Sequence, residues 1–161
     1  MGLEIERKFL LADDRWRAAA DAGEAFVQGY FCAEGNASVR VRIEGERANI
    51  NIKAAVIGAT RAEYEYPVPL ADARAMLADL CIAPPVEKKR YQVPYGGHTW
   101  EIDEFSGANA GLVVAEIELT AADEQFDCPD WLGREVTDQR CYYNHALAFH
   151  PYRDWQSTQA P

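Results

Sequence analysis

Three charged side chains recur at every second residue near the start of the chain. Glu4, Glu6 and Lys8 alternate with the apolar residues Ile5 and Phe9 on either side of Arg7. Successive side chains of a β-strand point to opposite faces, so the three charges would share one face of a strand. A polar strand face is ordinary where it meets water. Carboxylates and a lysine can also bind metals and anions, so the pattern alone allows a solvated surface or a charged site.

The same alternation returns in six later segments. Its paired positions are Arg40 and Arg42, Asn51 and Lys53, Glu63 and Glu65, Lys88 and Arg90, Glu101 and Asp103, and Glu116 and Glu118. Each segment carries mostly one sign of charge, whereas a solvated face usually mixes Ser, Thr, Gln and Lys. The apolar positions between the charges would face the other way, where helices with apolar stripes can cover them. We therefore expect the charged faces to point inward and to line a tunnel.

Segments rich in β-branched and aromatic residues, separated by turns that contain glycine, predict the strands that position these charges. The expected strands span residues 3–9, 26–32, 38–44, 48–54, 62–68, 86–93, 99–105 and 112–119. The expected helices span residues 13–21, 70–81 and 139–149. Hairpin-like succession predicts a β-dominated α+β fold, an eight-stranded antiparallel closed β-barrel with helices packed outside. The interior of such a barrel has room for side chains or one small ligand.

Composition narrows the possible partners and location. The 161 residues, 48% hydrophobic and 26% charged, are typical of a soluble globular protein, with one domain expected over 1–155 and a flexible tail over 156–161. A net charge of −10 disfavours nucleic acid and anionic membranes as partners. No apolar run reaches the roughly 18 residues of a membrane helix, and no signal-peptide pattern is present. We expect a cytoplasmic protein with reduced cysteines, either a monomer or a homodimer.

A tunnel with this lining needs partners for its charges, because buried charges are costly unless they are paired or coordinated to ions. Arginine and lysine bind phosphate oxygens, and carboxylates bind Mg²⁺ or Mn²⁺, which bridge phosphate groups. A polyanion together with divalent metal would therefore suit both kinds of side chain. The expected lining comprises the cations Lys8, Arg40, Arg42, Lys53, Lys88 and Arg90 and the acids Glu4, Glu6, Glu63, Glu65, Asp103, Glu116 and Glu118.

The ordered motifs resemble the CYTH superfamily, the triphosphate tunnel metalloenzymes, and in particular its short bacterial members. The matching motifs are Glu4-x-Glu6-x-Lys8, Arg40-x-Arg42, Lys53, Glu63-x-Glu65, Lys88-x-Arg90 and Glu116-x-Glu118, with Gln28-Gly29-Tyr30 and the segment 133–137 between and after them. The resemblance spans residues 3–148. It implies an eight-stranded tunnel that binds a triphosphate with divalent metal, Mg²⁺ or Mn²⁺. It also allows the C-terminal helix to plug one end, with Arg134 near its start.

The resemblance implies a role for each lining residue. The substrate-binding residues would be Lys8, Arg40, Arg42, Lys53, Lys88 and Arg90. The metal ligands would be Glu4, Glu6, Glu116 and Glu118, with Glu116 on the metal that bridges the triphosphate. The catalytic residues would be Glu4, Glu6, Lys8 and Lys88, and the supporting tunnel acids Glu63, Glu65 and Asp103.

The function expected first is hydrolysis of inorganic tripolyphosphate to pyrophosphate and phosphate. Three alternatives remain: a class IV adenylate cyclase, a thiamine triphosphatase and a noncatalytic polyphosphate-binding module. A thiamine triphosphatase would need aromatic or acidic contacts to the thiamine cation. The histidines, His98, His145 and His150, lack metal-ligand spacing and are expected in packing or at the surface, as are Tyr142 and Tyr143.

Overall fold

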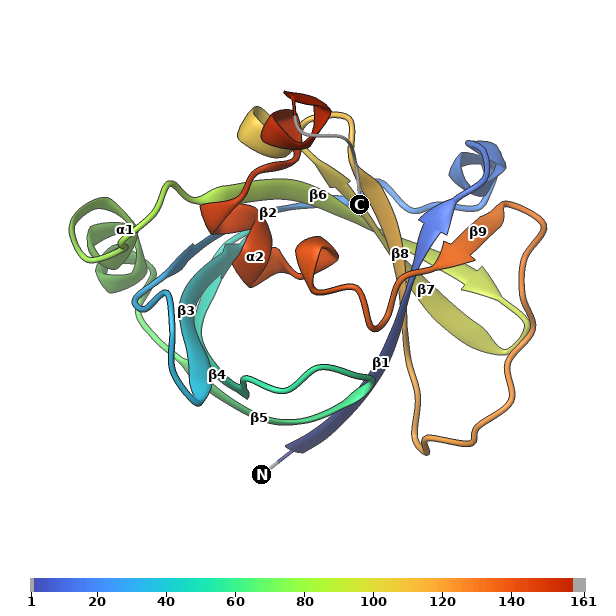
Figure 1. The fold of residues 1–161 in the computed structure, drawn as a ribbon, viewed down its shortest axis with the longest axis horizontal. Helices are drawn as coiled ribbons and strands as arrows, with labels where there is room; N and C mark the ends of the chain where they lie inside the picture. Colours follow the sequence, from blue (N-terminus) through green and yellow to red (C-terminus); the bar gives the residue numbers. More distant parts are fainter. Residues whose placement is uncertain (1, 158–161) are drawn as a thin grey trace.

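In the computed structural model, which describes residues 2–157, eight antiparallel strands close into a barrel and a ninth strand extends the sheet (Figure 1). The strands are β1 (Gly2–Leu11), β2 (Glu24–Tyr30), β3 (Ala37–Glu44), β4 (Arg47–Ala54), β5 (Thr60–Pro67), β6 (Val86–Tyr95), β7 (His98–Phe105), β8 (Val113–Glu118) and β9 (Leu132–Glu135). Around the barrel their order is β5-β4-β3-β2-β6-β7-β8-β1, and pairing of β1 with β5 closes the ring. The predicted fold class is confirmed.

The strand register places the charged positions of neighbouring strands on one face of the sheet. Lys8 of β1 lies opposite Glu116 of β8, and Lys53 of β4 lies opposite Glu63 of β5. Residues directly opposite one another in an antiparallel pair share a face, so one pair after another carries the charged face around the barrel. This shared face is the inner one, as the alternation predicts.

The outward apolar faces are covered by segments that pack against the barrel. Trp16, from the short 3₁₀ helix η1 (Arg15–Ala18), and Trp131, from the β8–β9 connection, pack in one buried cluster with Trp100 of β7. Helix α1 (Leu70–Asp79) packs its fully buried Ala73 against Val41 of β3. Trp100 therefore points away from the tunnel, as the alternation of β7 predicts.

The C-terminal helix α2 (Asn144–Phe149) lies across one end of the barrel and not on its outer wall. Its Leu147 and Ala148 are buried in a cluster with Tyr30, Phe105 and Val114. Those three residues lie on the inner face of their strands: Tyr30 and Phe105 follow Gln28 and Asp103 by two residues, and Val114 precedes Glu116 by two. Figure 1 shows α2 inside the ring of strands. Helix α2 therefore does not pack outside the barrel but forms an apolar plug at one end, as the resemblance allows for the C-terminal helix.

Two expected helices differ from the structure, and one observed strand was not expected. The helix over 13–21 is only the 3₁₀ turn η1, because the Asp13 carboxylate accepts the backbone N–H of Arg15 and the chain reverses at Gly23, whose φ is +69°. The helix over 139–149 divides into the 3₁₀ turn η3 (Arg140–Tyr142) and α2, because Tyr143 has extended backbone angles. Strand β9 was not predicted; it is four residues long and pairs with the end of β1.

Two sequence expectations concern the ends and the environment of the chain. Residues 152–157 form the 3₁₀ helix η4 (Tyr152–Ser157), while 158–161 of the expected tail lie outside the described residues. The flexibility of that tail and the domain bounds stay predictions. No helix within residues 2–157 is long and apolar enough to cross a membrane.

Candidate active site

The barrel encloses a cavity of about 550 Å³ whose walls are the inner faces of the strands. Twelve of the thirteen predicted tunnel residues line it: Glu4, Glu6, Lys8, Arg40, Arg42, Lys53, Glu63, Glu65, Lys88, Arg90, Glu116 and Glu118. The thirteenth, Asp103, is fully buried behind the lining, where it binds Lys88 and Arg90. The spacing of charges along the sequence therefore placed these side chains correctly around one space.

Glu116 lies between two cations of the cavity wall. Its two carboxylate oxygens accept hydrogen bonds from the ammonium of Lys8 and the guanidinium of Arg90. Burial opposes ionisation of Glu116, but the charges of Lys8 and Arg90 outweigh it and hold its pKa well below the usual range. Burial likewise opposes the charge of Lys8, yet Glu116 and Glu6 raise the pKa of Lys8. Both side chains are therefore ionised at neutral pH.

A second buried group joins strands β6 and β7. Arg90 donates from Nε to Oδ1 of Asp103 and from Nη2 to Oδ2, both at 2.7 Å, which is the bidentate arrangement of strong arginine–carboxylate pairs. Lys88 donates to the same carboxylate. Burial and the neighbouring charge of Arg90 lower the pKa of Lys88 to about 8, although Asp103 opposes the shift. Asp103 thus anchors two cations whose remaining donors face the cavity.

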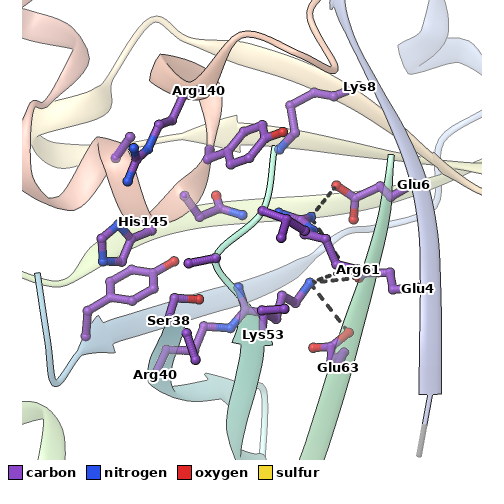
Figure 2. Close-up of a pocket in the computed structure, with 18 of the residues that line it drawn as sticks. Glu4, Glu6, Lys8, Ser38, Arg40, Lys53, Arg61, Glu63, Arg140 and His145 are labelled. Carbon is purple, nitrogen blue, oxygen red and sulfur yellow. Dashed lines mark hydrogen bonds and ion pairs between the residues drawn. The ribbon is translucent and has the colours of Figure 1, made fainter. Parts of the chain in front are cut away.

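A third group lies at the beginning of β1, where acids outnumber the cations. Lys53 Nζ lies 2.7 Å from Oε1 of Glu4 and 3.5 Å from Oε2 of Glu63. Arg61 Nη2 lies 3.5 Å from Glu4 and 3.7 Å from Glu6 (Figure 2). Sequence reasoning missed Arg61, although Arg61-x-Glu63-x-Glu65 continues the alternation. The expected strand began one residue too late to include it.

Two arginines of β3 carry unused donors. Arg40 is 7% exposed and donates to Oε1 of Gln28 at 3.4 Å, while Arg42 pairs with Glu65 at 3.0 Å. The buried Nε atom of each arginine lacks a hydrogen-bond partner within residues 2–157. Buried donors are nearly always satisfied in folded proteins, so these atoms point to a ligand with acceptor oxygens.

The plug contributes side chains to the same cavity. Arg140 and His145 line it from η3 and α2 (Figure 2), and no ion pair of Arg140 occurs among the described side chains. The Tyr143 hydroxyl donates to the carbonyl of Thr137 at 2.8 Å and accepts the N–H of Gly58 at 3.1 Å. His145 packs edge-on against Tyr30. The expected packing role therefore describes these two rings only in part, because both also line the cavity.

Arg134, which was expected near the start of the C-terminal helix, lies on strand β9 in the structure. Arg134 is exposed on β9 and does not line the cavity. Arg140, six residues later, is the arginine that lines it. The sequence pattern alone did not show which arginine of this segment faces the cavity, because β9 was not predicted and η3 interrupts the expected helix.

The carboxylates suit a hard divalent cation. Glu6 of β1 lies directly opposite Glu118 of β8, and burial together with Glu116 raises the pKa of Glu6. Burial and the charges of Glu4, Glu101 and Glu6 raise the pKa of Glu118. Oxygen ligands held in repulsion are favourable for Mg²⁺ or Mn²⁺. Within residues 2–157 no group of three acidic, His or Cys side chains lies close enough together to hold a metal ion. Several of these acids form ion pairs with Lys and Arg instead.

Comparison with known proteins agrees with the fold. The CYTH domain model matches residues 2–145. An inorganic triphosphatase from Acetivibrio thermocellus is 42% identical over 156 residues, which cover 97% of this chain and 99% of that protein. An inorganic triphosphatase from Nitrosomonas europaea is 33% identical and covers 90% of this chain and 96% of its own length.

A crystal structure of an inorganic triphosphatase superposes with a TM-score of 0.65. It is 31% identical and covers 92% of this chain and 95% of its own. The family model and these relatives span nearly the whole chain. This chain belongs to the CYTH family, and the resemblance inferred from its motifs is confirmed.

Proposed function

We propose that this chain is an inorganic triphosphatase that hydrolyses tripolyphosphate to pyrophosphate and phosphate inside the barrel, with Mg²⁺ or Mn²⁺ as cofactor. The observation that carries the proposal is the ring of lysines and arginines that line one cavity of the barrel. The 42% identity to an inorganic triphosphatase over nearly the full chain supports the same conclusion.

The cations of the cavity bind the substrate. Tripolyphosphate carries several negative charges in a short chain, and arginine forks and lysine ammonium groups match its oxygens. The unpartnered Nε atoms of Arg40 and Arg42 lie in the wall of β3, facing the same space as Lys8 and Lys88. The lysines and arginines of several strands therefore compensate the charge of the substrate when it enters this space. The substrate-binding set is Lys8, Arg40, Arg42, Lys53, Lys88 and Arg90.

The acids of β1 and β8 hold the metal and orient water. Glu4, Glu6, Glu116 and Glu118 are the proposed ligands, and a divalent ion bound by them supplies charge neutralisation and a more acidic water. Carboxylate oxygens of Glu6 and Glu118 accept hydrogen bonds from the attacking water and aim it at the terminal phosphorus. The supporting acids, Glu63, Glu65 and Asp103, hold Lys53, Arg42, Lys88 and Arg90 in place.

The reaction itself asks mainly for positioning and charge neutralisation. Water oxygen forms a bond to the terminal phosphorus while the bond from that phosphorus to the bridging oxygen breaks, and the proton that the water loses passes to the carboxylate of Glu6 or Glu118 that accepts its hydrogen bond. The leaving pyrophosphate takes the electron pair of that bond, next to Lys8 and Lys88. These ammonium groups stabilise the negative charge that develops on the bridging oxygen. Lys8 and Lys88 join Glu4 and Glu6 as the catalytic residues.

The setting follows from composition and from this substrate. We propose that the protein acts in the cytoplasm on a small-molecule triphosphate, as a monomer or homodimer. A net charge of −10 supports the absence of nucleic acid and anionic membrane partners.

Phosphate release from tripolyphosphate, ATP and thiamine triphosphate, each with and without Mg²⁺ or Mn²⁺, tests the proposal. Tripolyphosphate is expected to turn over fastest, and only with metal. Cyclic AMP formed from ATP would instead indicate a cyclase, and binding without turnover would indicate a polyphosphate-binding module. Glu4→Gln and Arg42→Ala are expected to abolish hydrolysis while circular dichroism stays unchanged. Full turnover by either variant would remove that residue from the active site.

A further inference from the structure

Arg61 occupies an unusual position among the cations of the tunnel. It lies opposite Glu4 in the register of β1 and β5, and its Nη2 atom approaches both Glu4, at 3.5 Å, and Glu6, at 3.7 Å. Figure 2 shows the Arg61 guanidinium between these two carboxylates. One nitrogen atom thus stands between the two acids of β1 that are proposed to hold metal.

The guanidinium of Arg61 is held from a second side. Its Cζ atom lies 5.1 Å from the centre of the Tyr143 ring, a distance at which a cation is attracted to an aromatic face. Tyr143 is itself fixed, because its hydroxyl bonds both Thr137 and Gly58. The Nε atom of Arg61 is buried and has no hydrogen-bond partner within residues 2–157. Arg61 therefore compensates the two acids while one of its own donors stays unused.

We propose that Arg61 is an internal counter-ion of the metal site, which occupies Glu4 and Glu6 when the tunnel is empty and yields them to metal when triphosphate arrives. The inference rests on the proposed function, since it takes Glu4 and Glu6 as metal ligands. The acids must give up Arg61 to bind a cation, and a phosphate oxygen then offers the displaced guanidinium a new partner.

This exchange couples metal to substrate. When metal binds alone, the displaced guanidinium of Arg61 has no negative partner in a partly buried site, which is costly. When triphosphate binds together with the metal, its phosphate oxygens pair with that guanidinium. A group that competes for the ligands lowers the affinity for metal by its own binding free energy. Removing Arg61 is therefore expected to tighten the binding of metal alone, although Arg61 belongs to the same site.

Titration calorimetry with MnCl₂ in the absence of any phosphate tests whether the loss of Arg61 raises the affinity for metal. Arg61→Gln is expected to bind Mn²⁺ about tenfold more tightly than the wild-type protein, a factor equal to about 1.4 kcal/mol. The same variant is expected to bind tripolyphosphate more weakly without metal. Arg61→Met, which fills similar space, keeps the test available if the glutamine variant does not fold. Unchanged or weaker Mn²⁺ binding by a folded variant would overturn the inference.

Two controls separate this inference from the proposed function. Arg17→Gln removes an arginine of the outer surface that pairs with Glu104, and its affinity for Mn²⁺ is expected to equal that of wild type. Adding Glu4→Gln to Arg61→Gln is expected to abolish the gain. If the double variant still binds Mn²⁺ tightly, the metal is not at Glu4 and the proposed metal site fails. If Glu4 is needed but Arg61→Gln gives no gain, only the counter-ion role fails.

Discussion

Glu6 and Glu118 face each other across β1 and β8 at a position where an antiparallel sheet normally places compatible side chains. Like charges directly opposite one another destabilise a sheet. Burial raises the pKa of both carboxyls, with Glu116 adding to the effect on Glu6 and Glu4 to the effect on Glu118. The barrel thus keeps an unfavourable pair at the point where the proposed reaction needs ligands for a cation.

Replacement of Glu118 by glutamine is expected to stabilise the metal-free protein and abolish hydrolysis. A carboxyl whose pKa is higher in the folded state binds more protons there, so its contribution to stability is fully present below the unfolded pKa and is lost as pH rises through the folded pKa. At neutral pH, Glu118→Gln removes the repulsion between Glu118 and Glu6, which raises the free energy of unfolding by roughly 0.5–1 kcal/mol. Urea unfolding at pH 7 without metal measures it. A less stable variant would contradict the interpretation of this pair.

Arg140 is expected to bind substrate from the plug. It lines the cavity, and no ion pair ties it to another described side chain, so a phosphate is its natural partner. Arg140→Gln is expected to raise KM for tripolyphosphate about tenfold, because a charge-assisted hydrogen bond contributes about 1.5–3 kcal/mol. Arg134→Gln is the matched control, since Arg134 is exposed on β9 and lies outside the cavity. Equal KM values in both variants would exclude Arg140 from binding.

The lining of the tunnel was predictable because strand alternation is a strict geometric rule. Once Glu4, Glu6 and Lys8 share a face with the later pairs, closure of the sheet brings them together. The resemblance allows a plug, but strand alternation could not predict which of its side chains reach the cavity. Its side chains, Arg140 and Tyr143, reach the cavity because a 3₁₀ turn and an extended residue interrupt the expected helix. The periodicity of apolar residues in the sequence does not predict such a break in a helix.

The ion pairs within the tunnel also lie beyond sequence reasoning. Alternation places Lys53 and Arg61 on the inner face, but only the packed structure shows that they bind Glu4 and not Glu65. Choice of partner depends on side-chain length and register between strands distant in the sequence. The roles assigned to the individual residues stay predictions that the variants described here test.

Lys88 is expected to set the alkaline limit of activity. Its pKa of about 8 means that the ammonium loses its proton as pH rises through 8, and with it the attraction for phosphate. The value of kcat/KM, which reflects groups of the free enzyme, is therefore expected to fall above about pH 8. Lys88→Arg is expected to move that fall to higher pH, because a guanidinium does not titrate in this range. An unchanged profile in an active Lys88→Arg enzyme would assign the limit to another group.

The plug is expected to contribute substantially to the free energy of unfolding of the barrel. Leu147 is 1% exposed and packs against inner-face side chains of the strands, whereas Leu80, just after α1, is 60% exposed. Leu147→Ala is expected to lower the free energy of unfolding by about 2–5 kcal/mol, and Leu80→Ala by much less. Urea denaturation of both variants measures the difference.

Asp103→Asn is expected to be more damaging than its conservative shape suggests. Asp103 is fully buried and binds both Lys88 and Arg90, so the amide would leave the buried Lys88 without its carboxylate and would remove one carboxylate partner of Arg90, which keeps Glu116. Removal of one partner from a buried ion pair costs about 3–5 kcal/mol. The control is Glu104→Gln on the opposite face of β7, where the carboxylate pairs with Arg17 at a solvent-exposed site and contributes little. Tripolyphosphate added with Mg²⁺ is expected to restore part of the melting temperature of Asp103→Asn, because the substrate supplies the missing negative charge. Equal losses of stability in the two variants would show that the cations of β6 do not depend on Asp103.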